Sequence, residues 1–348
     1  MPRLSVVVPV CDGMAQLERS LPAIFATLDH AGERDPEVIV VDDGSTDDSA
    51  EFARKKGASV VPSGGRMVGP ARARNVGVES ASGKIILFVD CDVVVHEDVA
   101  QKILEAFNAP DVVAIFGSYD SNPSHPGFMS QYVNLRHHHV HQKSNGNAST
   151  WWSGLGAIRR EVFEDVGGFD ADRYPRPSIE DIELGVRLRA HGHIRCVPTI
   201  QGTHLKRWSL GEVVRTDIFR RALPWANLMF QHPKTFGDLN VSAFERFRAL
   251  IALALVTSAM LTLYGVTAPW LTPLLFLVAI LLNRDLARLF NRCNGPWFAF
   301  RGLLFHQLYY IYSSSAYVLA RVKHGLHLSE TRTVKLSGPP TELPRQTK

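Results

Sequence analysis

Cysteine is scarce in this sequence, and the four that occur are far apart and form no CxxC pair. They are Cys11, Cys91, Cys196 and Cys293. This spacing excludes a disulfide-rich scaffold and a zinc-finger site, and it indicates reduced, structural thiols in a cytosolic setting. The N-terminus also lacks the pattern of a signal peptide, because the apolar run Leu4–Val10 is short and is followed almost at once by Asp12. We therefore expect the N-terminal part to stay on the side of the membrane where it is made.

Neither sign of charge dominates the composition. Lysine and arginine number 38 against 34 aspartate and glutamate, which gives a formal net charge of +4. The basic residues cluster beside apolar stretches near the C-terminus, so a membrane surface is a better partner than nucleic acid. At 348 residues, of which 45% are hydrophobic, the chain predicts one large globular domain and an additional module.

The first part of the chain alternates between β-branched apolar runs and amphipathic segments, which predicts an α/β domain with a parallel sheet. Strands are predicted at Leu4–Val10 and at residues 38–41, 85–89, 112–116, 151–158 and 194–198. Helices are predicted at residues 16–28, 48–56, 71–81, 99–107, 161–166 and 180–190. The polar ends of the first two strands would lie on one side of the sheet, because a helix connects them.

An apolar run at residues 85–89 ends abruptly in Asp90-Cys91-Asp92. Five hydrophobic residues without polar alternation predict a central parallel strand that is buried on both faces. Ligands of open α/β sheets collect at the carboxyl ends of strands, and strand residues two apart point the same way, so both carboxylates would face one cleft. Converging like charges favour an oxygen-bound Mg²⁺ or Mn²⁺. A polar strand end followed by a helix cap is the alternative explanation.

Further candidate residues lie at strand ends and helix starts. Asp42 and Asp43 end the second strand, where they could bind a base or ribose or lie beside a helix cap. Arg74 lies near the start of a helix, where an arginine is unfavourable for the helix dipole and could bind an anion. Glu180 and Asp181 occupy the first turn of a helix, where they could cap it or supply a general base.

Residues 119–150 interrupt the alternation and are rich in Ser, Asn, Pro and His. The histidines gather at His137, His138, His139 and His141. Adjacent residues of one helix or strand cannot all face one ion, so this segment is predicted to be a mobile polar loop over the active site. Gly154 and Gly156 follow in a strand, where they could let a ligand approach the backbone or could form a bulge.

Four motifs in this order resemble those of the family 2 glycosyltransferases, which have the GT-A fold. They are DDG at 42–44, DxD at 90–92, glycines at 154–156 and an ED pair at 180–181. ARN at 73–75 and GGFD at 167–170 extend the resemblance, which covers roughly the first 210 residues. It implies a Rossmann-like, mostly parallel sheet flanked by helices, followed here by an all-α membrane region.

The resemblance also implies roles for individual residues. Asp42 and Asp43 would hold the base and ribose of a sugar nucleotide, and Asp90 would hold the ribose or the metal. Asp92 and His204 would bind the metal, and Asp181, beside Glu180, would remove the proton of the acceptor. Pro9, Arg74, Gly154 and Gly156 are further candidates for binding the sugar nucleotide. Arg207 could bind an acceptor or donor phosphate, and Trp208 could stack on a sugar or pack in the core. HLKRW at 204–208 resembles the QxxRW motif of processive polysaccharide synthases, with histidine in place of glutamine.

These residue types suit displacement at a sugar's anomeric carbon. Negative charge develops on a departing nucleoside diphosphate, and one base without a covalent intermediate gives a single displacement and inversion. We expect a Mg²⁺- or Mn²⁺-dependent transferase that uses a UDP- or GDP-linked sugar and a lipid-linked or glycan acceptor. A processive polysaccharide synthase and a non-catalytic nucleotide-sugar-binding scaffold at the membrane are the alternatives.

The remaining sequence is expected to associate with membrane lipids. With residues 1–210 as the catalytic domain, residues 211–247 predict basic amphipathic interfacial helices and 248–325 predict membrane-embedded helices. The uncharged stretches 249–266 and 267–282 predict a hairpin with both ends in the cytosol, and 302–320 is expected to be re-entrant or interfacial. The protein is therefore expected to be multi-pass in the cell membrane, with a cytoplasmic catalytic domain and a disordered tail at 326–348.

Overall fold

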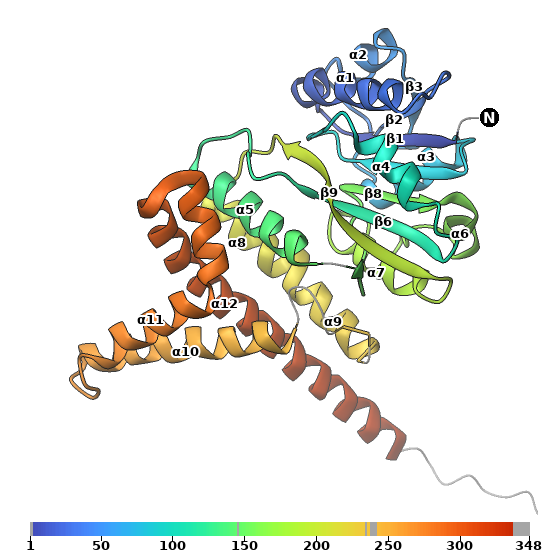
Figure 1. The fold of residues 1–348 in the computed structure, drawn as a ribbon. Coiled ribbons are helices and arrows are strands. Elements are labelled where there is room, and N and C mark those ends of the chain that lie inside the picture. Colours follow the sequence, from blue (N-terminus) through green and yellow to red (C-terminus); the bar gives the residue numbers. More distant parts are fainter. Residues whose placement is uncertain (1–2, 145, 234, 237–241, 337–348) are drawn as a thin grey trace, which may run out of the picture.

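The computed structural model describes residues 3–144, 146–233, 235–236 and 242–336, with side chains described up to residue 325. A sheet with helices on both faces forms one part of the molecule, and long helices near the C-terminus form the other (Figure 1). The last strand of the sheet along the chain ends at His204, and the C-terminal helices begin at Leu210. The predicted disordered tail falls largely on residues 337–348, which lie outside the described residues.

The described strands form one sheet in the order β3-β2-β1-β4-β8-β6-β9-β5, and β7 pairs with β9. The strands are β1 Leu4–Val10, β2 Glu37–Asp42, β3 Ser59–Pro62, β4 Ile85–Val89, β5 Val93–Val95, β6 Val112–Tyr119, β7 Gly146–Asn147, β8 Leu155–Arg159 and β9 His193–His204. The first four strands of this order run parallel, whereas β8 runs antiparallel to both β4 and β6. The α/β class with flanking helices is confirmed. The apolar pattern does not predict β3 or β5, because both are short.

Strand β1 illustrates why the central strands are continuous apolar runs. Val6 and Val8 belong to one core, packed by α1 (Met14–His30), whereas Val7 belongs to the opposite core, packed by α3 (Pro70–Glu79). Successive side chains of a strand point to opposite faces, and both faces of this sheet are covered. Polar residues are therefore excluded until the strand ends, which is where the candidate carboxylates occur.

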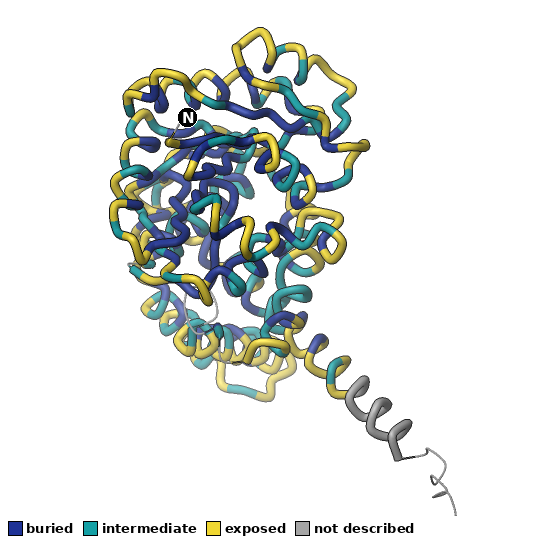
Figure 2. Tube along the Cα trace, turned by 90° about the vertical axis from the view of Figure 1, so that its right-hand side faces the viewer, coloured by how far each residue is buried: buried dark blue, intermediate teal, exposed yellow. Residues whose placement is uncertain are grey.

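Helices cover both faces of the sheet. The helices α1, α2 (Ser49–Lys55) and α4 (Val99–Ala106) contribute to one core, and α3, α6 (Arg160–Asp165) and α7 (Glu180–Leu188) contribute to the other. Burial is densest in the sheet and its two covering layers, and exposed residues are more frequent along the C-terminal helices (Figure 2).

The predicted loop at 119–150 is wrong, because α5 (Phe128–Lys143) occupies half of that segment. This helix has no regular apolar stripe, since different faces are buried against different partners. Tyr132 packs in a core shared with α12 (Arg284–Leu336), while the His141 ring packs edge-on against Phe116 of β6, with ring centroids 5.2 Å apart. Helix α5 therefore joins the sheet to the C-terminal helices.

A nearly continuous helical stretch follows the sheet. It consists of α8 (Leu210–Arg215), the π-helix η1 (Thr216–Ala222) and α9 (Leu223–Gln231). Ser209 and Glu212 form a capping box that satisfies the first N–H groups of α8. The amphipathic pattern predicts a helix here but not the π-helical turn, a rare feature that is frequent at functional sites.

The last helices expose an apolar surface. Helices α10 (Ala243–Leu263) and α11 (Leu271–Leu282) form a hairpin packed on α12, which is kinked at Gly295, where φ is 80°. Within the described chain, α10 is the one helix long and apolar enough to cross a membrane. Helix α11 is about 18 Å long, which is less than the roughly 30 Å of a hydrocarbon core. The predicted multi-pass arrangement is therefore not supported.

The close approach of α3 to the sheet depends on Gly77, and this dependence gives the first testable prediction. A Cβ atom at Gly77 would lie 2.3 Å from Cγ1 of Val7 and 3.0 Å from Cγ2 of Val41. We expect Gly77→Ala to reduce the free energy of unfolding by about 1–3 kcal/mol through overpacking. Denaturant titration of the full-length protein in detergent measures this change. Gly211→Ala, in α8 with open space around it, is the matched control and should leave stability unchanged or slightly higher. Equal stability of the two variants would contradict the packing argument.

Candidate active site

A cavity of about 910 Å³ lies at the carboxyl ends of β1, β2 and β4, and we call it the sheet-edge cavity. The predicted residues that line it are Pro9, Asp43, Arg74, Asp90, Asp92, Glu180, Asp181, His204 and Trp208. Side chains that are far apart in the sequence thus meet at one place, because the ends of parallel strands share an edge. Asp42, Gly154, Gly156 and Arg207 are not among the described residues that line it.

Asp43 holds the loop that follows β3. Its carboxylate accepts hydrogen bonds from the hydroxyl of Ser63 (2.7 Å) and from the backbone N–H groups of Val68 (3.0 Å) and Gly69 (3.1 Å). The residue is 7% exposed, so these bonds replace water contacts that burial removes. Asp43 therefore shapes one wall of the cavity as well as facing into it.

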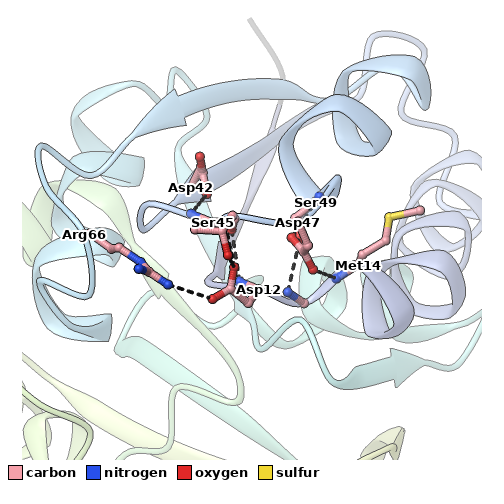
Figure 3. A network of polar contacts seen from close by, with 9 residues as sticks. Asp12, Met14, Asp42, Ser45, Asp47, Ser49 and Arg66 are labelled. Atoms are coloured by element: carbon pink, nitrogen blue, oxygen red, sulfur yellow. Dashed lines mark hydrogen bonds and ion pairs between the residues drawn. The ribbon is translucent and has the colours of Figure 1, made fainter.

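A second polar network ties the loops after β1 and β2 together (Figure 3). The Asp12 carboxylate accepts bonds from the N–H of Thr46 (2.6 Å) and from Arg66 (3.4 Å), and the Asp12 N–H donates to Ser45 (3.0 Å). The bonds from Thr46 lower the pKa of Asp12. Asp42 accepts from the Ser45 N–H at 2.8 Å, so its carboxylate stabilises its own turn instead of facing the cavity. Of the two predicted carboxylates, only Asp43 lines the cavity, and the binding of a base or ribose by Asp42 stays a prediction.

Arg74 lies between two carboxylates from opposite sides of the cavity. Its guanidinium group donates to Asp90 at 2.7 Å and to Glu180 at 3.3 Å, and the residue is 4% exposed. Although burial opposes the charged form, the carboxylates of Asp90 and Glu180 raise the pKa of Arg74 and keep it protonated. The anion predicted for this arginine is thus supplied by the protein itself.

Asp90 and Asp92 line the same cavity but have different partners. Strand β4 ends at Val89, so the alternation that would aim both carboxylates at one target no longer applies. Asp90 pairs with Arg74, whereas Oδ2 of Asp92 lies 3.5 Å from Nε2 of His204. Burial alone would raise the pKa of Asp92, but its contact with His204 lowers it. Asp92 and His204 lie close enough together to share a metal, and the predicted part of Asp90 in binding the metal or the ribose stays a prediction.

Aromatic and imidazole rings pack behind His204. The Tyr119 ring stacks on His204 with centroids 4.2 Å apart and an interplanar angle of 11°. The Tyr119 ring also contacts His137, with ring centroids 4.6 Å apart. His141 follows His137 by one helical turn of α5, with ring centroids 4.0 Å apart. Burial lowers the pKa of His137 well below its usual value and that of His141 to about 4, so both rings are neutral at pH 7. These neutral histidines form part of the wall of the sheet-edge cavity.

Asp181 is the carboxylate whose environment is most altered. Its Oδ2 accepts bonds from the N–H (3.2 Å) and hydroxyl (3.3 Å) of Ser153, and its Oδ1 accepts from the N–H of Ile182 (2.8 Å). Burial, together with the negative charge of Glu180, raises the pKa of Asp181 to about 6. A carboxyl group with such a pKa can exchange a proton near neutral pH.

The segment after β9 places alternate residues in the cavity. His204, Lys206 and Trp208 line it, while Arg207 is exposed and is not among the lining residues. The contact of Arg207 with a phosphate stays a prediction. The ammonium group of Lys206 lies 4.3 Å from the centre of the Trp208 ring. Lys206 is therefore the positively charged side chain of this segment that lines the cavity.

Gly154 and Gly156 make room for tryptophan rings. A Cβ at Gly154 would lie 2.5 Å from the Trp152 ring, and one at Gly156 would lie 2.2 Å from the Trp152 carbonyl oxygen and 2.8 Å from the Trp151 ring. Neighbouring side chains and backbone thus approach these glycines closely, and the predicted approach of a ligand stays a prediction. The Gly154 carbonyl also accepts the Asp90 N–H at 3.1 Å, which fixes the end of β4.

Several residues of the site have no clear signal in the sequence. Ser153, Tyr119, Arg220 and Arg221 contact or line the site but belong to none of the motifs, and Lys206 lies within HLKRW without being assigned a role there. Lys206 could have been found by extending the alternation that begins at His204. Arg220 and Arg221 come from η1, and their position follows from tertiary packing that local patterns do not encode.

The site fits a divalent cation in part. Asp92 supplies a carboxylate and His204 an imidazole nitrogen, both donors that Mn²⁺ accepts, and their atoms face each other at 3.5 Å. No group of three or more His, Cys, Asp or Glu side chains within the described ranges is arranged to hold a metal. Further ligands would have to come from a substrate or water, as is common for cations that bind phosphate groups.

Residues 5–167 match the protein family described as Glycosyl transferase family 2. The matched range runs from β1 through α6 and contains the DDG and DxD motifs, while Asp181 and His204 lie beyond it.

Two curated relatives are similar to part of the chain. Validoxylamine A glucosyltransferase from Streptomyces hygroscopicus is 29% identical over 228 residues, which cover 55% of this chain and 52% of that protein. Undecaprenyl-phosphate 4-deoxy-4-formamido-L-arabinose transferase from Aeromonas hydrophila is 28% identical over 207 residues, which cover 54% of this chain and 61% of that protein. The chain therefore spans about half to three fifths of the length of these relatives.

A solved structure is similar over more than the sheet domain. A mannosyltransferase from Pyrobaculum calidifontis, in complex with GDP-Man and Mn²⁺, matches 91% of this chain and 87% of that chain. The TM-score is 0.55 and the sequence identity is 20%. At this identity the similarity shows a shared fold, of the GT-A type in its α/β part.

The two ion pairs of Arg74 give the second testable prediction. Arg74→Met leaves the buried carboxylate of Glu180 unpaired, so we expect the free energy of unfolding to fall by about 3–5 kcal/mol. The double variant with Glu180→Gln should recover part of this loss, with a coupling energy of about 1–3 kcal/mol in a double-mutant cycle. Arg72→Met, two residues earlier on the exposed side of α3, is the control and should change stability by less than about 0.5 kcal/mol. Additive effects of the two substitutions would show that the bridge is not stabilising.

Proposed function

Because residues 5–167 form a glycosyl transferase family 2 domain, we propose that this chain transfers a sugar from a nucleoside-diphosphate sugar to an acceptor hydroxyl group, with inversion at the anomeric carbon. The observation that carries the proposal is the environment of Asp181. Its pKa is raised to about 6, and it lines the same cavity as Asp43 and Asp92. A general base is most effective when its pKa lies near the working pH.

Asp181 acts as the base in this mechanism. Its carboxylate, oriented by Ser153 and by the N–H of Ile182, accepts the proton of the acceptor hydroxyl as the oxygen attacks. The bond from the acceptor oxygen to the anomeric carbon forms while the bond to the diphosphate oxygen breaks. Because the attack comes from the face opposite the leaving group, one displacement inverts the configuration.

Glu180 has a positioning role in the proposed mechanism and is not a second base. Its carboxylate accepts bonds from Arg74 at 3.3 Å and from the N–H of Ser178 at 2.8 Å, and the residue is 5% exposed. Both carboxylate oxygens of Glu180 are thus occupied by donors from the protein. Its charge instead raises the pKa of its neighbour Asp181.

The donor occupies the side of the cavity formed by the strand ends. Pro9 and Asp43 line the part near the loops after β1 and β2, where the base and ribose would bind. Asp92 and His204 would hold Mn²⁺ or Mg²⁺ beside the diphosphate, and such a cation neutralises charge on the leaving group. The ammonium group of Lys206 adds a positive charge from the chain itself on the same side.

We further propose that the reaction occurs at the cytoplasmic face of a membrane, with a lipid-linked acceptor. One relative is, by its name, a transferase that involves undecaprenyl phosphate. Helix α10 has the length and composition to enter a bilayer, and Leu250 and Leu263 on it are 63% and 86% exposed. An acceptor confined to the membrane would explain why a sugar-transfer domain carries an apolar surface.

Replacement of the base gives the third testable prediction. Asp181→Asn should lower the rate of UDP or GDP release from a panel of sugar nucleotides, in the presence of a membrane lipid extract, by about 10²–10⁴-fold. Donor affinity should stay within about twofold. The unfolding temperature at pH 7.5 should not fall, because the neutral amide avoids the cost of ionising a buried carboxyl group. Asp172→Asn, which changes an exposed carboxylate outside the cavity, is the control. Full turnover by Asp181→Asn would remove Asp181 from this role, and absence of donor binding by the unaltered protein would refute the function.

The pH dependence of the reaction gives the fourth prediction. Since the base must be ionised, kcat/KM should rise with pH through an apparent pKa of about 6 and level off above pH 7. In Glu180→Gln the acidic limb should move to lower pH, because the neighbouring negative charge that raises the pKa of Asp181 is gone. Arg74, which no longer pairs with a carboxylate at position 180 in this variant, also lowers the pKa of Asp181. An acidic limb that stays in place in Glu180→Gln would contradict the assignment of the limb to Asp181.

A further inference from the structure

A second cavity, of about 870 Å³, lies between the sheet domain and the C-terminal helices, and the proposed sugar transfer does not use it. Residues of α5, η1, α9, α10 and α12 line it, and we call it the helix cavity. Its volume is in the range of pockets that bind small organic ligands. The chemistry of its two ends differs, and this difference indicates what it binds.

The outer end of the helix cavity is apolar. Its lining includes Leu250, Leu253, Val318, Leu319 and Val322, whose exposed fractions are 63%, 54%, 59%, 48% and 53%. These side chains therefore belong both to the cavity wall and to the exposed apolar surface of α10 and α12. Yellow segments along these helices mark that surface (Figure 2). A hydrocarbon chain can pass from such a surface into the cavity without contact with water.

The inner end is positively charged. Arg136 forms two bonds of 3.0 Å with the carboxylate of Asp217, and Tyr312 donates to the same carboxylate at 2.8 Å. Arg221 reaches Asp217 at 3.4 Å, and its side chain is 42% exposed. Two guanidinium groups thus share one carboxylate, which leaves a positive charge without a partner. Over the whole lining, four arginines face two carboxylates: Arg136, Arg221, Arg246 and Arg248 against Asp217 and Glu245.

The two cavities share a wall at this charged end. Arg136, Val140, Arg221 and Trp225 line both of them. The indole nitrogen Nε1 of Trp225 is buried and has no hydrogen-bond partner among the described residues. A buried N–H group without a partner is costly, so this donor indicates a missing acceptor atom. Guanidinium and indole N–H groups together suit the oxygens of a phosphate group.

The shared wall is connected to the candidate base. The hydroxyl of Ser178 donates to the backbone carbonyl of Arg220 in η1 at 3.0 Å, and the N–H of Ser178 donates to Glu180 at 2.8 Å. Glu180 immediately precedes Asp181. The π-helix therefore lies beside the start of α7, and Arg221 and Asp181 line the same sheet-edge cavity.

We propose that one amphiphilic acceptor spans both cavities: a hydrocarbon chain fills the helix cavity, and a phosphate or diphosphate group binds Arg221 and Trp225. The sugar linked to that phosphate extends into the sheet-edge cavity, and its hydroxyl oxygen faces Asp181. This inference rests on the proposed function and specifies its acceptor as a lipid-phosphate-linked sugar. In the transfer step, the hydroxyl oxygen bonds to the anomeric carbon, the nucleoside diphosphate leaves with the bonding electron pair, and the proton goes to Asp181.

Farnesyl phosphate tests the proposal, because it contains the chain and the phosphate without the sugar. Its saturable binding to the full-length protein in detergent is compared with that of farnesol and of inorganic phosphate. Arg221→Gln removes the charge at the shared wall, and Ser314→Trp, on α12, fills the helix cavity. Arg215→Gln and Leu308→Trp are the matched controls, since both residues are exposed and line neither cavity.

We expect farnesyl phosphate to bind at least tenfold more tightly than farnesol or inorganic phosphate, and each of the two test variants to weaken it at least tenfold. The controls should stay within twofold. Undiminished binding by Arg221→Gln and Ser314→Trp would overturn the proposal, as would competition by inorganic phosphate that equals that of farnesyl phosphate. Displacement by a soluble oligosaccharide alone would assign the cavity to a glycan and also overturn it.

Affinity for the sugar nucleotide, measured separately on the same samples, distinguishes the two hypotheses. Retained donor binding with no specific binding of farnesyl phosphate would refute the lipid acceptor and leave the sugar-transfer function in place. Loss of donor binding in the unaltered protein would refute the function itself. Unchanged donor affinity in Ser314→Trp is the expected result, because Ser314 lines the helix cavity and not the sheet-edge cavity.

Discussion

The salt bridges of Arg74 are the interaction on which the site depends. The guanidinium group is almost fully buried, and a buried cation is tolerated only when its charge is compensated by nearby carboxylates. The partners come from the end of β4 and from the start of α7, which are widely separated in sequence. The pairing fixes the distance between these two elements. Asp181, the residue after Glu180, is thereby held opposite the strand ends, in a position that neither element could maintain alone.

Much of the sheet could be predicted from the sequence, because burial on both faces leaves a distinct pattern. The bounds of β1 and β4 follow directly from their apolar runs, and the carboxylates after β4 do lie at the cavity. The detailed partners could not be predicted in the same way. Strand geometry ends at Val89, so the alternation that would pair Asp90 with Asp92 does not extend to them, and long-range contacts with Arg74 and His204 decide where each points.

Prediction failed where an element is buried by partners that are remote in the chain. Helix α5 carries histidines and polar residues on faces that contact the sheet and α12, so its sequence lacks the regular apolar stripe of a helix on one core. The same reason applies to η1, whose arginines reach the sheet-edge cavity only because α9 and α12 hold the π-helix against the sheet domain. The apolar C-terminal helices, by contrast, were evident from composition, although their number of membrane crossings was not.

The reversed direction of β8 has a consequence for how this architecture can vary. In a wholly parallel sheet, the loops at the carboxyl-end edge all follow strands. Strand β8, which lies between β4 and β6 in the sheet, is antiparallel to both, so at this edge the chain enters β8 instead of leaving it. Ser153, which orients Asp181, is on this incoming segment, whereas Asp43 is on an outgoing one. The two segments reach the same edge of the sheet, but no single loop contains both. An insertion in one of them would therefore not lengthen the other.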